Sequence, residues 1–237
     1  MSGPVSLDGT ARPHPGRYSE DSDDPLVRIW PLFGLRIATP HLVLTPLRDE
    51  HLPELIDAVL AGIHDPAVMP FSTPWTDAPP EVLVTETARY QWRTRAAVTP
   101  DDWSICFAVL HQQRVIGVQE LVARRFGVRR QVDSGSWLTR SAQGQGLGAE
   151  MRAGVLHLAF DHLGATTAVS AAAVWNQASL GVSRRLGYRP NGTAVIEARS
   201  GEAESQQKLV LTAKDFVRPS WVAEVSGVES AKAFLQI

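Results

Sequence analysis

Three glycines at alternate positions, Gly144, Gly146 and Gly148, mark the segment of the chain best suited to bind a ligand. They directly precede a helical pattern of apolar residues that begins at Leu147. The first amides of a helix have no partner inside the helix, and the helix dipole adds a positive field at that end. Glycine also lets successive N–H groups converge on a bound anion. The segment therefore predicts a phosphate or diphosphate site, the alternative being a plain glycine-rich turn.

Two common phosphate-binding motifs fit this segment poorly. A P-loop needs Lys and then Ser or Thr after its last glycine, whereas Ala and Glu follow Gly148. Residues 144–149, GQGLGA, match the dinucleotide pattern GxGxxG/A, but that pattern needs an acidic residue at the end of the next strand to hold a ribose. Because no Asp or Glu occurs between Asp161 and Glu197, dinucleotide binding is disfavoured.

A third pattern matches in two places. Residues 143–148, QGQGLG, resemble the Q/R-x-x-G-x-G/A loop of the GNAT superfamily of acyl-CoA-dependent N-acyltransferases. The segment that starts at Asn176 and includes Ser179, Arg185 and Tyr188 resembles the N-x-x-A/S-(x)5-K/R-x-G-F/Y block of the same family. The two motifs occur in the family's order, and the chain is similar to the branch that contains the ribosomal-protein N-terminal acetyltransferases.

The resemblance implies which residues hold the acyl-CoA. In the family the loop amides bind the diphosphate of coenzyme A. Backbone groups of the preceding strand, which carries a bulge, pair with the pantetheine arm and direct an N–H to the thioester carbonyl, where it stabilises the oxyanion. The implied acyl-CoA-binding residues are Trp137, Leu138, Thr139, Gln143, Gly144, Gln145, Gly146, Leu147, Gly148, Asn176 and Arg185. The co-substrate is acetyl-CoA or another acyl-CoA, and no metal is expected.

The resemblance implies that the first helical region and the loop after it form one wall of the acceptor site. Residues 64–80 contain five prolines, which exclude long regular structure, yet they also contain Phe71 and Trp75. These aromatics either line an acceptor pocket or form a hydrophobic clasp on the core. His64 or Asp65 could hold the amine, or could be ordinary loop residues. Ser136 begins the strand close to where acceptor and thioester would meet.

Glu120 is a candidate general base for the amine, and His64, Asp65 or a chain of water molecules are the alternatives. It lies in a predicted strand over residues 114–123, where alternation places it on the same face as Ile116 and Val118. A carboxylate beside apolar neighbours would suit a general base. The alternative is a solvated residue near the edge of the sheet.

The departing thiolate needs a proton, and the sequence departs from the family's common pattern here. The tyrosine that often serves as the acid lies seven residues after the motif asparagine, and this chain has Ser183 there. Ser179 is the first candidate acid and Ser183 the second, although Ser179 could instead cap the helix that follows Asn176. Because a CoA thiolate is a tolerable leaving group, the reaction can also proceed without a dedicated acid.

The predicted function is an N-acyltransferase that moves an acetyl or other short acyl group, succinyl included, from acyl-CoA to an amine by direct attack in a ternary complex. The acceptor is a small-molecule or peptide amine. Four arginines, Arg124, Arg125, Arg129 and Arg130, bracket a predicted hairpin tip. They form a solvated loop, or one of them binds the carboxylate of a dicarboxylic acyl group. The alternative function is a non-catalytic acyl-CoA-binding sensor domain.

The elements that position these residues follow from periodicity. Strand patterns cover residues 42–45, 103–110, 114–123, 132–139 and 166–175, with a closing hairpin over 194–199 and 206–211. Helical patterns cover residues 52–63 and 81–97, start again at 147 and follow Asn176. The resemblance implies an α/β (α+β) fold with a GNAT-like mixed, mostly antiparallel central sheet of about six to seven strands. Helices flank this sheet, which is splayed at the acyl-CoA site.

Composition limits the partners and the domain plan. With a net charge of −2, the 237-residue chain has no electrostatic reason to bind nucleic acid or membranes. Its single cysteine, Cys106, excludes an internal disulfide and is expected to be a buried structural thiol. Residues 1–24 are predicted to be a disordered leader without the apolar core of a signal peptide, which favours the cytoplasm. Residues 25–218 form a single acyltransferase domain. The apolar tail, 219–237, packs on it or on a partner subunit in a homodimer.

Overall fold

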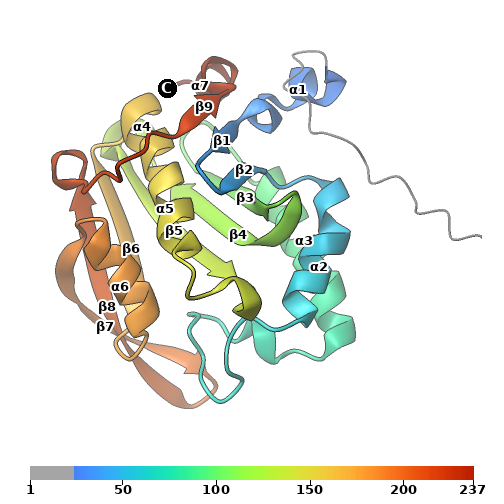
Figure 1. Ribbon diagram of the computed structural model, residues 1–237, viewed down its shortest axis with the longest axis vertical. Helices are drawn as coiled ribbons and strands as arrows, with labels where there is room; N and C mark the ends of the chain where they lie inside the picture. Colours follow the sequence, from blue (N-terminus) through green and yellow to red (C-terminus); the bar gives the residue numbers. More distant parts are fainter. Residues whose placement is uncertain (1–23) are drawn as a thin grey trace, which may run out of the picture.

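Strands and helices alternate along most of the chain (Figure 1), and the computed structural model describes residues 24–237. The helices are α1 (Pro25–Ile29), α2 (Leu52–Leu60), α3 (Pro80–Ala96), α4 (Phe126–Arg129), α5 (Leu147–His157), α6 (Gln177–Arg185) and α7 (Val228–Leu235). The strands are β1 (Arg36–Ala38), β2 (Leu42–Pro46), β3 (Trp103–His111), β4 (Arg114–Ala123), β5 (Gln131–Leu138), β6 (Thr167–Ala173), β7 (Arg189–Arg199), β8 (Glu202–Thr212) and β9 (Glu224–Ser226). The predicted leader lies outside the described residues except for Asp24, whose carboxylate caps α1 by accepting from the amide of Leu26.

The strands form one sheet in the order β7-β8-β6-β5-β4-β3-β2-β1-β9. Only the β5–β6 pair is parallel among these nine strands. The mixed, mostly antiparallel class is therefore confirmed. The number of strands exceeds the prediction because β1 and β9, with three residues each, are too short to show an alternating pattern.

The parallel strands β5 and β6 pair over only part of their length. The ladder joins Gln131–Asp133 to Thr167–Val169. The hydroxyl of Ser170 then donates to the carbonyl oxygen of Ser134 at 3.2 Å, where the two strands begin to separate. Beyond this point, the part of β5 that leads to the glycine turn has no strand on its β6 side. This is the splay that the resemblance implied.

Two hydrophobic cores lie on opposite faces of the sheet. Phe107 of β3 and Leu121 of β4 pack in the larger core with α5, whereas Cys106 and Val118 pack in the smaller core with α2. Cys106 is buried and free, as predicted. The cores exist because successive side chains of a strand point to opposite faces.

A register shift in the β3–β4 pair places Ile116 on the other face of β4 from the one predicted. The pairing shifts between Val109 and Leu110, and Ile116 packs against the larger core while Val118 belongs to the smaller one. Placing Ile116 on the same face as Glu120 is therefore wrong, because a bulge adds one residue and reverses the alternation. By contrast, β5 pairs with β4 without a register shift from Val132 to Leu138, so the bulge implied for β5 is not found there.

The C-terminal segment packs on its own chain. Strand β9 pairs with β1, and α7 lies against the N-terminal segment, where the rings of Phe234 and Trp30 are 5.0 Å apart. Arg218 donates to both carboxylate oxygens of Asp161 at 2.8 and 2.7 Å. Across residues 24–237, no helix combines the length and apolar character needed to cross a membrane.

Candidate active site

The glycine turn leaves open space in front of α5. Gly146 precedes the helix with φ = +85°, and Gly144 has φ = +75°, both in the left-handed region that glycine adopts without strain. A β-carbon placed on either residue would meet no atom within 4 Å. Gly148 has an ordinary backbone, and a β-carbon there would lie 3.8 Å from Val182. The space beside Gly144 and Gly146 is therefore unfilled, and it lies at the start of an eleven-residue helix, a position that favours an anion.

Two glutamines hold this turn in place. The side-chain amide of Gln143 donates to the carbonyl oxygens of Ile63 and Leu138, at 2.7 and 2.8 Å. The side-chain amide of Gln145 donates to the carbonyl oxygen of Ser141 at 2.7 Å. Both side chains thus fix the loop conformation, and the backbone amides remain for ligand binding.

The register of β5 decides which of its backbone groups face the splay. The amide of Thr139 donates to Ile116 of β4 at 2.8 Å. Because alternate residues of an antiparallel strand bond to the same neighbour, Trp137 and Thr139 direct their backbone to β4. The amides of Ser136 and Leu138 point the other way, toward the splay. Of the three residues implied for the thioester, only Leu138 has its backbone there, and Ser136 joins it.

Glu120 lies on the α3 face of the sheet. Its carboxylate accepts from the hydroxyl of Tyr90 at 3.1 and 3.2 Å, from the hydroxyl of Ser104 and from the thiol of Cys106 at 3.7 Å. Burial, followed by the nearby carboxylate, raises the pKa of both Tyr90 and Cys106, so both remain protonated donors at neutral pH. Oxygen Oε2 lies 3.8 Å from where a β-carbon of Gly135 would be. Because β4 is an inner strand, a position near the sheet edge is excluded.

Sequence reasoning missed the donors to Glu120. Ser104 could have been found, because it precedes Cys106 by two residues and so shares its face of β3. Tyr90 carried no such signal, since its contact depends on how α3 crosses the sheet.

The proline-rich loop forms an aromatic row that ends on β5. Ring centroids are 5.6 Å apart for His64 and Phe71, 5.4 Å for Phe71 and Trp75, and 6.2 Å for Trp75 and Trp137. The ring nitrogens of His64 are occupied within the loop, one by the hydroxyl of Thr76 at 2.7 Å. The row thus places Phe71 and Trp75 on the same face as Glu120, each half-buried.

Asp65 belongs to the loop in the same way. Its carboxylate accepts from the amide of Ala67 at 3.0 Å, and its carbonyl oxygen contacts the second ring nitrogen of His64 at 2.8 Å. The carboxylate is exposed and shapes a local turn.

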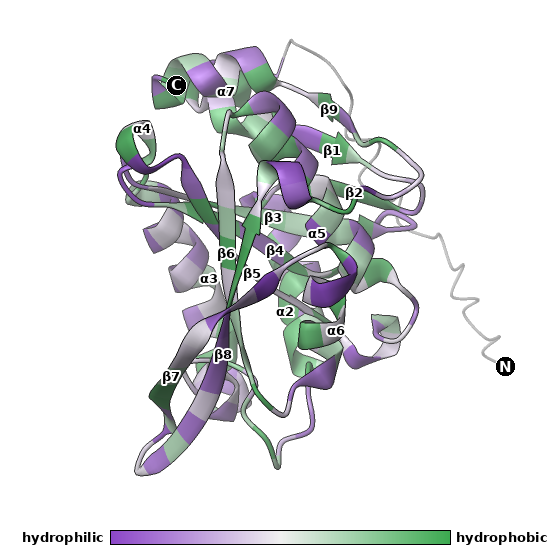
Figure 2. Ribbon diagram, turned by 90° about the vertical axis from the view of Figure 1, so that its left-hand side faces the viewer, coloured by the Kyte–Doolittle hydropathy of each residue, from purple (hydrophilic) through white to green (hydrophobic). Residues whose placement is uncertain are grey.

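The β7–β8 hairpin covers the same loop. In Figure 2 its far end extends below the rest of the sheet. Arg199 donates to both carboxylate oxygens of Asp77, at 2.7 and 2.9 Å, and Gln206 donates to the hydroxyl of Ser72 at 3.2 Å. The hairpin therefore fastens the aromatic loop from the side opposite α2.

Helix α6 contributes the second motif. The side chain of Asn176 accepts from the amide of Ser179 at 3.1 Å and caps the helix, so the alternative in which Ser179 is the cap is wrong. Ser183 is fully buried, and its hydroxyl donates to the carbonyl oxygen of Ser179 at 3.1 Å. That proton is already engaged, which favours Ser179 over Ser183 as an acid. Arg185 is exposed in the last turn.

Arg152 of α5, which sequence reasoning missed, is the most unusual side chain near the splay. It is 5% exposed, and its guanidinium donates to the hydroxyls of Ser183 at 3.0 Å and Ser136 at 3.3 Å. Burial lowers its pKa, whereas Tyr188 and Asp133 act in the opposite direction. An arginine in a helical pattern normally indicates an exposed position, so the sequence offered no signal.

The four loop arginines lie elsewhere. They lie in or beside α4, which joins the end of β4 to the start of β5, whereas the glycine turn follows the end of β5. Since β5 has eight residues, the two ends are roughly 26 Å apart. Arg124 donates to the carbonyl oxygens of Trp103 and Ala123, and Arg130 lies over the ring of Phe126. The structure does not bring these arginines to the splay.

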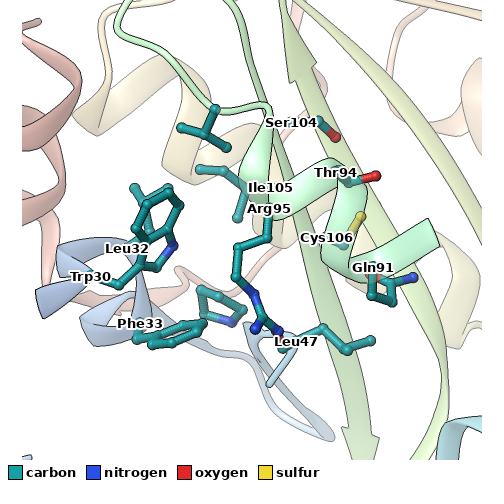
Figure 3. A pocket seen from close by; sticks show the side chains of 12 residues that line it. Trp30, Leu32, Phe33, Leu47, Gln91, Thr94, Arg95, Ser104, Ile105 and Cys106 are labelled. Atoms are coloured by element: carbon teal, nitrogen blue, oxygen red, sulfur yellow. The ribbon is translucent and has the colours of Figure 1, made fainter. Parts of the chain in front are cut away.

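A small cavity behind the Glu120 cluster is a packing gap. Figure 3 shows it between the N-terminal segment, α3 and β3, with Arg95 and Cys106 among its lining residues. Its volume of about 30 Å³ is the size of one water molecule. Arg95 is already paired with Asp49 at 3.0 Å and lies over the ring of Phe33. In the described part of the chain, no group of His, Cys, Asp or Glu residues could hold a metal ion.

Comparison with known proteins gives the family. Residues 41–189 match the family described as acetyltransferase (GNAT) domain. Among solved structures, Mycobacterium smegmatis RimJ in complex with CoA-disulfide superposes with a TM-score of 0.65 at 18% identity, covering 84% of this chain and 91% of that one. RimL, a ribosomal alpha-N-protein acetyltransferase in complex with coenzyme A, has a TM-score of 0.59 at 20% identity, covering 73% and 95%.

A third similar structure is named for a small-molecule acceptor, spermidine, instead of a ribosomal protein. A chimera of spermidine N-acetyltransferase SpeG from Vibrio cholerae and hSSAT has a TM-score of 0.60 at 16% identity, covering 76% of this chain and 99% of that one. These identities show a shared fold. The family match extends over more than half of the sequence, and the chain therefore belongs to the GNAT acetyltransferase family.

Proposed function

We propose that this protein transfers an acetyl or other short acyl group from acyl-CoA to a primary amine by direct attack in a ternary complex. One observation carries the proposal. The splay between β5 and β6 lies between an open, amide-lined helix start on one side and a hydrogen-bonded carboxylate, Glu120, on the other. A donor and an acceptor can therefore enter from opposite sides and meet at β5.

The donor side fits coenzyme A. The amides around Gly146 and the start of α5 would hold the diphosphate, and Arg185 at the end of α6 adds a positive charge. The pantetheine arm would follow the free edge of β5, where the backbone of Ser136 and Leu138 faces the splay. An amide there stabilises the oxyanion that forms on the thioester carbonyl.

The chemistry balances without a redox step. The amine nitrogen attacks the thioester carbon, a C–N bond forms and the C–S bond breaks. The nitrogen loses one proton, which Glu120 accepts directly or through water, and the thiolate takes up one proton to give CoA-SH and an amide. Ser179 is the preferred of the two candidate serines to supply that proton, because the hydroxyl of Ser183 already donates to the carbonyl oxygen of Ser179.

The acceptor is proposed to be a small-molecule or peptide amine. RimL is named for a ribosomal-protein N-terminus and SpeG for spermidine, so proteins of this fold accept amines of very different size. In this chain the half-buried Phe71 and Trp75 line the acceptor side below the β7–β8 hairpin. They favour an amine that carries an apolar group.

Two measurements test the proposal. Acetyl-CoA and CoA should raise the melting temperature of the purified protein by mass action, while NAD and ATP should not. Release of CoA-SH should then depend on an added amine. Stabilisation by NAD or ATP alone would overturn the assignment of the glycine turn. Saturable CoA binding without turnover on any amine would leave a sensor domain instead.

Glu120→Gln tests the base. The variant keeps the size of the side chain but cannot accept the proton, so kcat should fall by about a hundredfold or more, with the affinity for acetyl-CoA unchanged. Glu81→Gln, at an exposed position of α3, is the matched control and should behave as the wild type. Full activity of Glu120→Gln would remove Glu120 from the mechanism.

A further inference from the structure

Arg152 is a buried cation, and the one carboxylate that acts on its charge, Asp133, does not pair with it directly in the described residues. Within residues 24–237 it forms no ion pair, and its hydrogen bonds are to two neutral hydroxyls, those of Ser136 and Ser183. Its Nε atom has no hydrogen-bond partner. Charged side chains are almost never fully buried unless they are paired, because removal from water is costly. A guanidinium left in this state indicates that an anion completes the site.

Other polar atoms beside Arg152 are also incompletely used. Tyr188 and Ser134 are buried, and their hydroxyls lie within reach of each other but make no other side-chain hydrogen bond in the described residues. Tyr188 interacts electrostatically with Arg152, and its hydroxyl lies near that of Ser134. Buried polar groups in a native structure are normally satisfied, and those that are not mark a missing ligand or water. These groups gather where β5 and β6 separate.

The position of Arg152 relative to the proposed donor limits which anion it can meet. It lies six residues beyond Gly146, which is about 9 Å along the helix axis from the diphosphate end. It contacts Ser136, whose amide faces the splay at the proposed position of the thioester. The loop arginines are at the far end of β5, so Arg152 is the cation next to the acyl group.

We propose that Arg152 binds the terminal carboxylate of a dicarboxylic acyl group carried by CoA, such as a malonyl, succinyl or glutaryl group. This inference rests on the proposed acyl-CoA site. A carboxylate accepts two parallel hydrogen bonds from a guanidinium, which a methyl or alkyl end cannot do. Ser136, half-buried between Arg152 and the splay, is the contact that the carboxylate replaces.

The test compares acyl groups of equal length. Dissociation constants of succinyl-CoA and butyryl-CoA are measured by calorimetry with the full chain, because both acyl groups have four carbons and only one ends in a carboxylate. A charge-assisted pair should favour succinyl-CoA by about ten- to a hundredfold. Equal binding by the wild type overturns the inference and needs no variant. Failure of CoA itself to bind would overturn the proposed function, so the two failures are distinct.

Variants then show whether Arg152 causes the preference for succinyl-CoA over butyryl-CoA. Arg152→Met keeps the length of the side chain without its charge, and it should abolish the preference for succinyl-CoA while leaving the affinity for butyryl-CoA unchanged. Its melting temperature should equal or exceed that of the wild type, because a buried charge without a direct ion pair is removed. Arg184→Met, an exposed arginine on α6, is the control and should keep the preference. A destabilised Arg152→Met that still prefers succinyl-CoA would make Arg152 a structural brace and refute the inference.

Discussion

Two glycines of the same turn should respond in opposite ways to the same substitution. Gly146 precedes α5 with φ = +85°, whereas Gly148 is inside the helix with an ordinary backbone. Gly146→Ala forces an L-residue into the left-handed region, which costs roughly 1–2 kcal/mol. Gly148→Ala replaces glycine in a helix and stabilises by roughly 0.5–1 kcal/mol. The β-carbon at Gly148 meets Val182 at 3.8 Å, an ordinary contact that adds no steric cost.

These energies convert into measurable shifts. For a chain of this size, 1 kcal/mol moves the melting temperature by about 2–4 °C. Gly146→Ala should therefore melt roughly 2–8 °C below the wild type, and Gly148→Ala up to about 4 °C above it. The added methyl group of Gly146→Ala also enters the open space where the diphosphate is proposed to lie. Its affinity for CoA should fall by about tenfold or more, while Gly148→Ala should bind as the wild type does.

Calorimetric melting with and without CoA measures both effects on the same samples. A melting temperature of Gly146→Ala equal to that of the wild type would refute this prediction, because the left-handed backbone would then carry no cost. Normal CoA binding by a destabilised Gly146→Ala would show that the open space is not the diphosphate site. A matching loss of CoA affinity in Gly148→Ala would point to the whole turn instead of to one position.

Three further predictions concern stability and the carboxylate cluster. Burial lowers the pKa of His51 to about 4. Between about pH 6.5 and pH 4 the unfolded chain therefore binds a proton that the folded chain does not. The free energy of unfolding, measured by denaturant titration, should fall by at most about 3 kcal/mol as the pH falls through this window. Asn176→Ala removes the cap of α6 and should lose about 1 kcal/mol, whereas Asn176→Ser keeps a capping hydroxyl and should lose much less. Tyr90→Phe removes a donor from Glu120 and should lower kcat without weakening the binding of acetyl-CoA.

Controls separate these effects from general damage. His51→Asn keeps an acceptor for the amide of Arg48 and should flatten the dependence of stability on pH, whereas His111→Asn should leave it as it is. A slope that survives in His51→Asn would assign the effect to other groups. Equal stability of the two Asn176 variants would show that the cap contributes little. An unchanged kcat in Tyr90→Phe would mean that its hydroxyl does not affect Glu120.

Much of the donor side could be predicted from the sequence because its signals are local. The glycine turn, the amphipathic start of α5 and the asparagine that opens α6 are each set by residues within one or two turns of chain. Leu147, Met151 and Val155, which share one helical face because they are spaced four residues apart, are all buried. The inner strands of the sheet are also recognisable, because each is long enough to show an alternating pattern within its own residues.

The remainder depends on contacts between distant segments. No local pattern shows that Arg152 would be buried against Ser136 and Ser183, because its environment is created by the packing of α5 on β5 and α6. The bulge that turns Ile116 away from Glu120 is likewise a property of two paired strands. The four loop arginines have the charge needed to bind an acyl carboxylate, but they lie at the other end of β5 from the glycine turn.

The pairing of β1 with β9 has a consequence for the order of synthesis and folding. Translation delivers β1 near the start of the described chain and β9 near its end, so the backbone of Arg36–Ala38 emerges long before its partner exists. Until then the growing chain exposes an unpaired sheet edge, a recognised route to association with other chains. A chain that stops before Glu224 would keep that edge open permanently. Loss of the last residues should therefore appear first as aggregation during expression, with the distant active site itself intact.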